Sequence, residues 1–113
     1  MRTRVVAEAR EEELLDAFRH VRLEGPITAA EAPHVRAMLQ ESARLGDPRV
    51  LMVDLEGVTA LDAAGVAALL AGRRAVGAQA EGLMVLRPNR IVRRALKESG
   101  TISAFQLWNG AGM

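Results

Sequence analysis

Two aspartates, Asp54 and Asp62, are the residues best placed for chemistry. Asp54 stands near the end of an apolar run, and Asp62 comes immediately before a pattern of helical spacing. Two carboxylates at the carboxyl end of a parallel sheet could hold a metal ion, but that site needs further acidic residues and a well-placed lysine. The only lysine, Lys97, is expected on an outer helix face. We therefore expect Asp62 to be a helix N-cap, followed by two good helix formers, Ala63 and Ala64.

Other catalytic and metal-binding patterns are absent from the sequence. The chain has no cysteine, which excludes a disulfide framework, a catalytic thiolate and cysteine-ligated zinc. His20 and His34 are too far apart to form a helical pair, so they do not indicate a zinc site. The sequence has no Gly-x-Ser-x-Gly turn, phosphate-binding loop or dinucleotide fingerprint. We therefore predict no enzyme activity, no cofactor and no metal.

Basic residues gather along the third predicted helix and just before it. They are Arg87, Arg90, Arg93, Arg94 and Lys97. Such a row could bind phosphate or nucleic acid. However, the formal net charge of the chain is only +1, and aromatic residues make up 3% of it. We therefore favour a solvated helix face and expect no direct nucleic-acid partner.

Short apolar or alternating segments predict strands, and apolar residues at helical spacing predict helices. The predicted strands are residues 3–7, 18–24, 49–55 and 83–86. The predicted helices are residues 31–45, 63–76 and 89–100, counting the cap and the final glycine of the third. Residues 10–17 could form a helical turn or part of a hairpin connection. One more short element is expected within residues 101–108, with Phe105 and Trp108 packing at the end of the core.

The segment before the first long helix contains turn residues and a capping pattern. Gly25 and Pro26 are expected to end the second strand. Thr28 and Glu31 have the spacing of a capping box. Pro33 is tolerated only in the first turn of a helix, so we expect the helix to begin near residue 30.

The alternation of strand and helix is typical of a parallel sheet with right-handed crossovers. We therefore predict a single α/β domain over residues 1–113, with a mostly parallel central sheet of four or five strands and about four helices packed on it. The longest apolar stretch, residues 66–71, is far shorter than the roughly 20 residues of a membrane span. No signal peptide is recognisable either, so we expect no membrane insertion and a cytoplasmic location.

Residues 50–70 resemble the STAS domain, the module of bacterial anti-sigma factor antagonists. In that family a buried strand ending in Asp-Leu leads to Asp-Ser-Ser-Gly at the start of a helix, and the corresponding positions here are residues 54–55 and 62–65. Residues 21–28 and 83–100 resemble the flanking parts of the family. The resemblance thus covers about residues 18–108, with 1–17 as an N-terminal strand and connection and 109–113 as a tail.

The resemblance implies a protein-binding surface at this helix start and in the neighbouring loop. The residues that it implies for contact with a partner are Asp62, Ala63, Ala64, Gly65, Val66, Pro26 and Thr28. Gly65 would leave room for the partner's backbone. In the family, the first serine after the aspartate is phosphorylated by the partner kinase, and the complex then dissociates. Ala63 stands in that position and cannot accept phosphate, so we expect no phosphorylation. Thr59, a hydroxyl expected in the connecting loop, is the alternative phosphoacceptor, but we favour a turn residue that satisfies a local backbone group.

The partner implied is an anti-sigma factor of the serine kinase type or another regulatory protein. Since STAS modules also serve as accessory subunits of ABC-type lipid transporters and as scaffold subunits in stress signalling, these functions are the alternatives. Binding of a nucleotide or small ligand at the helix start is a third possibility. The sequence does not decide between a monomer and a homo-oligomer.

Overall fold

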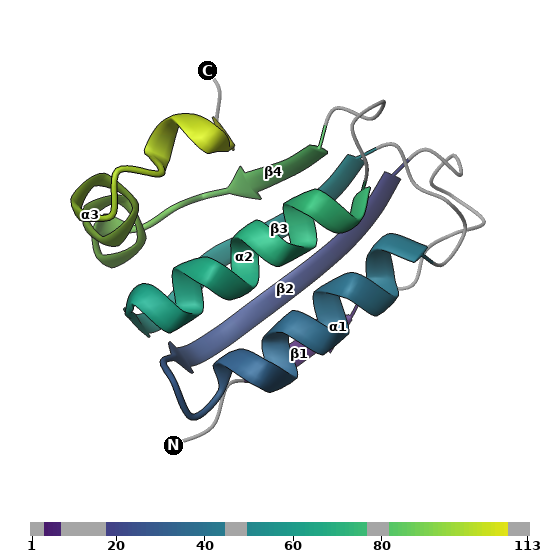
Figure 1. Ribbon diagram of the computed structural model, residues 1–113, viewed down its shortest axis with the longest axis horizontal. Helices are drawn as coiled ribbons and strands as arrows, with labels where there is room; N and C mark the ends of the chain where they lie inside the picture. Colours follow the sequence, from purple (N-terminus) through teal and green to yellow (C-terminus); the bar gives the residue numbers. More distant parts are fainter. Residues whose placement is uncertain (1–3, 8–17, 45–49, 77–81, 109–113) are drawn as a thin grey trace.

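Five strands form one sheet in the part of the chain that the computed structural model describes, residues 4–7, 18–44, 50–76 and 82–108. The strands are β1 (Arg4–Ala7), β2 (Phe18–Ile27), β3 (Val50–Leu61), β4 (Gly82–Leu86) and β5 (Gln106–Trp108). They are ordered β1-β2-β3-β4-β5 (Figure 1). β1 is antiparallel to β2, and every other neighbouring pair is parallel. The predicted mostly parallel α/β sheet is therefore confirmed.

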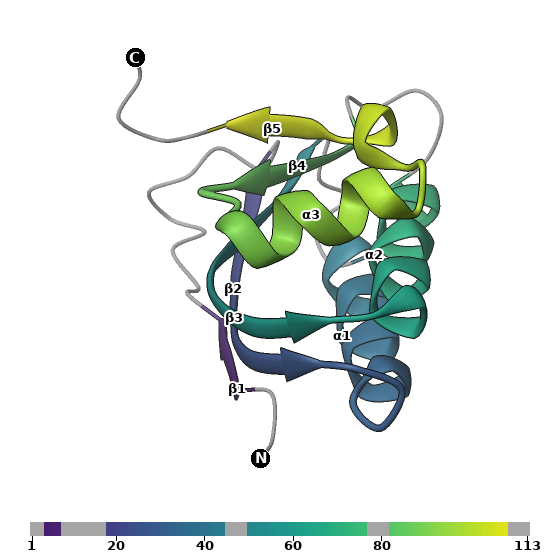
Figure 2. The same cartoon turned by 90° about the vertical axis from the view of Figure 1, so that its left-hand side faces the viewer.

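Three α-helices and one short 3-10 helix accompany the sheet in the described residues. They are α1 (Ala32–Arg44), α2 (Ala63–Val76), α3 (Arg90–Glu98) and η1 (Ile102–Ala104). α1 and α2 lie side by side on one face of the sheet, and α3 runs across the end of β4 (Figures 1 and 2). The helical turn considered for residues 10–17 lies outside the described residues. Among the helices that are described, none has the length and apolar character to span a membrane.

The core lies between the sheet and the pair α1 and α2. Because side chains alternate along a strand, every second residue of β2, β3 and β4 points toward these helices. These residues are Val21, Leu23, Leu51, Val53, Leu55, Leu83 and Val85, all at most 1% exposed. The helices contribute Val35, Leu39, Val66 and Leu69, of which the most exposed is Val66 at 4%. Aliphatic packing therefore holds α1 and α2 against one face of the sheet.

β2 and β3 both extend further than the sequence predicts. β2 does not end at Gly25 and Pro26 but continues to Ile27, with a register shift between Gly25 and Pro26. Gly25 has a φ of 94°, which glycine tolerates, and Pro26 lacks the N–H that a regular ladder uses. β3 likewise passes residue 55 and ends at Leu61, paired along this extension with β2. The two extensions turn together toward α1 and α2 (Figure 2).

The C-terminal element follows the prediction only in part. Phe105 is 7% exposed and packs in the core, as expected. Trp108 is 49% exposed, so the prediction that it packs at the end of the core was wrong. The reason is its place in β5, where Gln106 and Trp108 point to one side and half-buried Leu107 to the other.

Candidate partner-binding site

Asp62 connects the loop after β2 to the start of α2. Its Oδ1 accepts a hydrogen bond from the backbone N–H of Gly65 at 2.9 Å, which confirms the predicted N-cap. Its Oδ2 accepts a hydrogen bond from the N–H of Ala29 at 3.1 Å. The N–H of Asp62 itself donates to the carbonyl of Ile27 at 3.4 Å. One residue therefore holds together two segments that are more than 30 residues apart in the chain.

Gly65 is buried against the end of β2. A Cβ atom on this residue would lie 2.2 Å from the carbonyl oxygen of Ile27 and 2.6 Å from Cδ1 of Leu61. The expectation that Gly65 leaves room for a partner's backbone was therefore wrong, because the backbone that approaches it belongs to β2. Val66 is only 4% exposed and also faces the core. Both residues are buried beneath the surface of the site, and neither presents a side chain at that surface.

The remaining predicted contact residues reach the surface. Asp62 and Ala63 are exposed, and Ala64, Pro26 and Thr28 are half-buried. Ala29 is also exposed and belongs to the same surface through its bond to Asp62. Its place in the site could not be predicted from the sequence, because an alanine in a loop gives no signal. We call the surface formed by Thr28, Ala29, Asp62, Ala63 and Ala64 the loop junction.

The Thr28 hydroxyl is engaged within the chain. It donates to Oε1 of Glu31 at 2.6 Å, and the N–H of Thr28 donates to the same oxygen at 2.9 Å. The second bond confirms the glutamate half of the capping box, but the hydroxyl donates instead of accepting from the helix. These bonds, chiefly that of the hydroxyl, lower the pKa of Glu31. α1 begins at Ala32, which leaves Pro33 in its first turn as predicted.

A shallow groove of about 410 Å³ runs from the loop junction along the seam between α1 and α2. Its lining consists of Ala29, Ala32, Pro33, Arg36, Ala37, Gln40, Ala64, Ala67 and Ala68. Methyl groups make up most of this surface, and Arg36 is the only charged residue in it. The groove thus adds an apolar contact area beside the loop junction.

Thr59, the alternative phosphoacceptor, is exposed. It lies in β3, within the extension that pairs with β2, and not in a connecting loop as expected.

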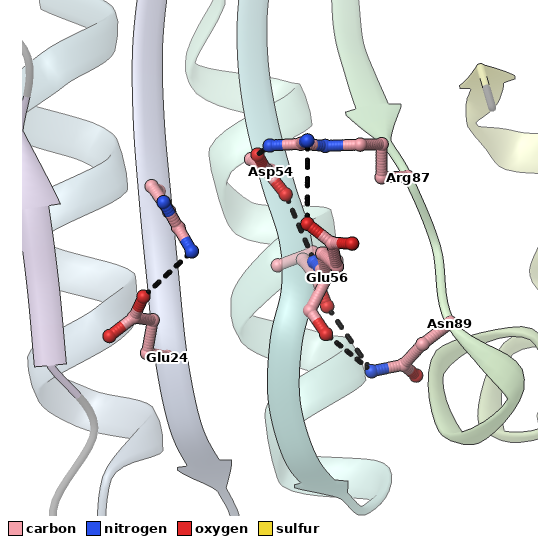
Figure 3. A network of polar contacts seen from close by, with 7 residues as sticks. Glu24, Asp54, Glu56, Arg87 and Asn89 are labelled. Carbon is pink, nitrogen blue, oxygen red and sulfur yellow. Dashed lines mark hydrogen bonds and ion pairs between the residues drawn. The ribbon is translucent and has the colours of Figure 1, made fainter. Parts of the chain in front are cut away.

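Asp54 forms a separate polar network on the face of the sheet that points away from α1 and α2 (Figure 3). It is fully buried and makes an ion pair with Arg87, while its Oδ1 accepts from the N–H of Glu56 at 3.0 Å. Arg87 also lies 3.4 Å from Oε1 of Glu56. The bond to Asp54 raises the pKa of the Arg87 guanidinium. Arg87 therefore belongs to this network and not to the basic face of α3.

Asp54 and Asp62 use their oxygens on different partners, so they do not form a shared site. No cluster of three or more His, Cys, Asp or Glu side chains able to hold a metal occurs within residues 4–7, 18–44, 50–76 and 82–108.

Asn89 ties the start of α3 to the extension of β3. Its Oδ1 accepts from the N–H of Val92 at 2.9 Å, which confirms the predicted cap. Its Nδ2 donates to the carbonyls of Glu56 at 3.0 Å and Val58 at 2.8 Å. These carbonyls lie beyond the pairing of β3 with β4, which ends at Asp54. Asn89 thus supplies hydrogen bonds that a neighbouring strand would otherwise donate to these carbonyls.

Comparison with known proteins agrees with this architecture. The family model described as "Mlab, STAS domain" matches residues 11–102. Among curated protein sequences, none matches the chain.

Three solved structures illustrate the structural similarity. An anti-sigma factor antagonist from Mycobacterium paratuberculosis is 22% identical with a TM-score of 0.77, over 94% of this chain and 85% of that one. The anti-sigma factor antagonist SpoIIAA in its unphosphorylated form is 20% identical with a TM-score of 0.72, over 92% and 87%. A sulfate transporter family protein from Wolinella succinogenes is 18% identical with a TM-score of 0.66, over 85% and 79%.

Proposed function

The chain belongs to the STAS domain family, and on this basis we propose that it is a regulatory module that binds a partner protein through the loop junction. The observation that carries the proposal is the double use of Asp62, which fixes the loop after β2 against the start of α2. The side chains that this arrangement presents are mostly methyl groups beside an apolar groove. Such a surface supports the docking of a protein partner.

The proposed partner is an anti-sigma factor of the serine kinase type. Support comes from the structural similarity to two anti-sigma factor antagonists. In this proposal Ala63 takes the place of the phosphorylated serine of the family, so the complex has no covalent switch. The protein would then bind its partner constitutively.

The test is a binding measurement between the purified chain and each serine-kinase anti-sigma factor of the same organism. We expect one of them to bind. Ala63→Glu, which adds a charge at the exposed centre of the loop junction, should weaken binding at least about tenfold. Ser103→Glu adds the same charge on the exposed η1 helix and should leave affinity unchanged. Absence of binding across the whole set would overturn the proposal.

A second candidate function is that of an accessory subunit of a membrane transporter. The similarity to a sulfate transporter family protein favours it. In this case the loop junction would dock on a transporter subunit instead of a sigma regulator. Affinity purification of the chain from its own organism would separate the two functions. Recovery of a transporter ATPase, lost in Ala63→Glu and kept in Ser103→Glu, would support this candidate.

A further inference from the structure

Two large apolar side chains are exposed in the described residues, and both lie close to Arg87. Ile91 is 41% exposed in the first turn of α3, and Trp108 is 49% exposed in β5. The N–H of Arg87 donates to the carbonyl of Trp108 at 2.6 Å. Ile91 follows Arg87 by four residues, which limits their Cα separation to about 14 Å. One protein partner, covering roughly 800 Å², could therefore contact both side chains.

Positive charge is concentrated on α3, the helix that carries Ile91. α3 contains Arg90, Arg93, Arg94 and Lys97 but only one acidic residue, Glu98. Glu98 pairs with Arg94 at 3.1 Å. Arg90 and Lys97 are exposed and have no ion-pair partner in the described part of the chain. Since the net charge of the whole chain is only +1, this helix is a local concentration of positive charge.

β5 is the outermost strand on its side of the described sheet. It pairs with β4 on one side, and no described strand pairs with the other. Edge strands of this kind can accept an extended segment of another chain through backbone hydrogen bonds. Trp108 projects from one face of this strand, so a segment added at the edge would place one of its side chains beside Trp108.

We propose that a second binding surface exists here, formed by Arg90, Ile91, Arg94 and Trp108, which we call the α3–β5 edge. Its ligand is an acidic protein segment in extended conformation that carries apolar side chains. Acidic groups of the ligand face α3, and apolar groups cover Trp108 and Ile91. An exposed aliphatic side chain beside a single aromatic suits a protein ligand better than the stacked bases of a nucleic acid. This surface uses none of the residues of the loop junction.

Trp108 reports directly on this surface because it is the only tryptophan and the chain has no tyrosine. The probe is a short synthetic peptide of alternating glutamate and leucine, titrated into the full chain. We expect the emission of Trp108 to shift to the blue and its quenching by acrylamide to fall. Raising the salt concentration should weaken the affinity, because charge contributes to it.

The matched variants are Arg90→Glu and Arg73→Glu, both at exposed helical arginines without an ion-pair partner in the described residues. Arg90→Glu should weaken peptide binding about fivefold or more, while Arg73→Glu on α2 should leave it unchanged. Circular dichroism verifies that both variants fold.

The proposal is overturned if the peptide leaves the emission of Trp108 unchanged. It is also overturned if a lysine–leucine peptide binds equally well, if Arg90→Glu binds like the wild type, or if only oligodeoxythymidine changes the emission. Binding at the loop junction is measured separately with Ala63→Glu, so either surface can fail alone.

Discussion

At the scale of single residues, Asp62 carries the geometry of the loop junction. Replacing it with alanine removes the acceptors for the N–H groups of Gly65 and Ala29. We expect Asp62→Ala to lower the free energy of unfolding by about 1–2 kcal/mol. Asp62→Asn keeps one side-chain oxygen and should lose less. Urea denaturation measures both, with Ala63→Ser as a control at an exposed neighbour. Equal stability of Asp62→Ala and the wild type would contradict the bridging role.

Gly65 is the second residue on which the loop junction depends. A methyl group there would overlap the carbonyl oxygen of Ile27, which belongs to the backbone and cannot rotate away. We expect Gly65→Ala to destabilise the fold by about 2–3 kcal/mol or more, although alanine favours helices. Gly72→Ala in the same helix is the control. Its Cβ would meet side-chain atoms of Leu39 and Leu83 at 3.0–3.2 Å, so the loss should be smaller. A larger loss for Gly72→Ala would show that the contact at Ile27 is not limiting.

These two residues show what a sequence can reveal about a site. An aspartate before a helical pattern is a recognisable cap, so the role of Asp62 could be predicted. The burial of Gly65 could not, because it depends on how closely α2 approaches the end of β2. Ala29 enters the site only through a bond to a residue far along the chain. Small side chains acquire their roles from the backbone around them, and that arrangement is not local information.

At the scale of elements, the cores of the strands were predictable and their ends were not. The apolar runs that became the middle of β3 and β4 are visible in the sequence. The extension of β3 depends on its pairing with β2 past the register shift after Arg22, so neither strand alone indicates its own end. Gly25 and Pro26 resemble a turn in the sequence, yet the parallel neighbour accommodates them within β2.

The junction between α3 and β3 depends on a single side chain with two functions. Asn89 caps α3 with its oxygen and donates to the carbonyls of Glu56 and Val58 with its nitrogen. Asn89→Asp keeps the cap but places an acceptor against those carbonyls. We therefore expect Asn89→Asp to cost about 1–3 kcal/mol of unfolding free energy at neutral pH. Chemical denaturation measures the loss. A neutral effect would mean that the cap alone matters, because aspartate caps as well as asparagine.

The start of α1 should make stability depend on pH. Hydrogen bonds from Thr28 lower the pKa of Glu31 below its ordinary value of 4.5 in the folded state. The carboxylate therefore contributes stability above pH 4.5 that is lost as the pH falls through the lowered pKa. The difference in unfolding free energy between the wild type and Glu31→Gln should shrink over this acidic range. A difference that stays constant from neutral to acidic pH would show that the charge of Glu31 contributes nothing.

At the scale of the whole molecule, the three helices begin at the end of the sheet where the parallel strands finish. The loop junction is built at this end from the ends of β2 and β3 and the starts of α1 and α2. The α3–β5 edge is built from different elements, so the two surfaces could be occupied independently. Both surfaces are built on the same sheet and its helices, so their positions relative to each other are fixed. In the proposed function, the loop junction is the surface that decides how the module responds to a kinase.

In a complex with a serine kinase, the proposed absence of a switch can be tested through ATP. A phosphoryl group would add about −1.5 to −2 charges at the loop junction and make burial of that surface unfavourable. The wild type should therefore stay bound in the presence of ATP, with residues 59–66 unmodified by mass spectrometry. Ala63→Ser supplies a hydroxyl at the exposed position beside Asp62 and should be phosphorylated and released. Phosphate on exposed Thr59 of the wild type, followed by release, would instead show that the switch survives at another residue of the same surface region.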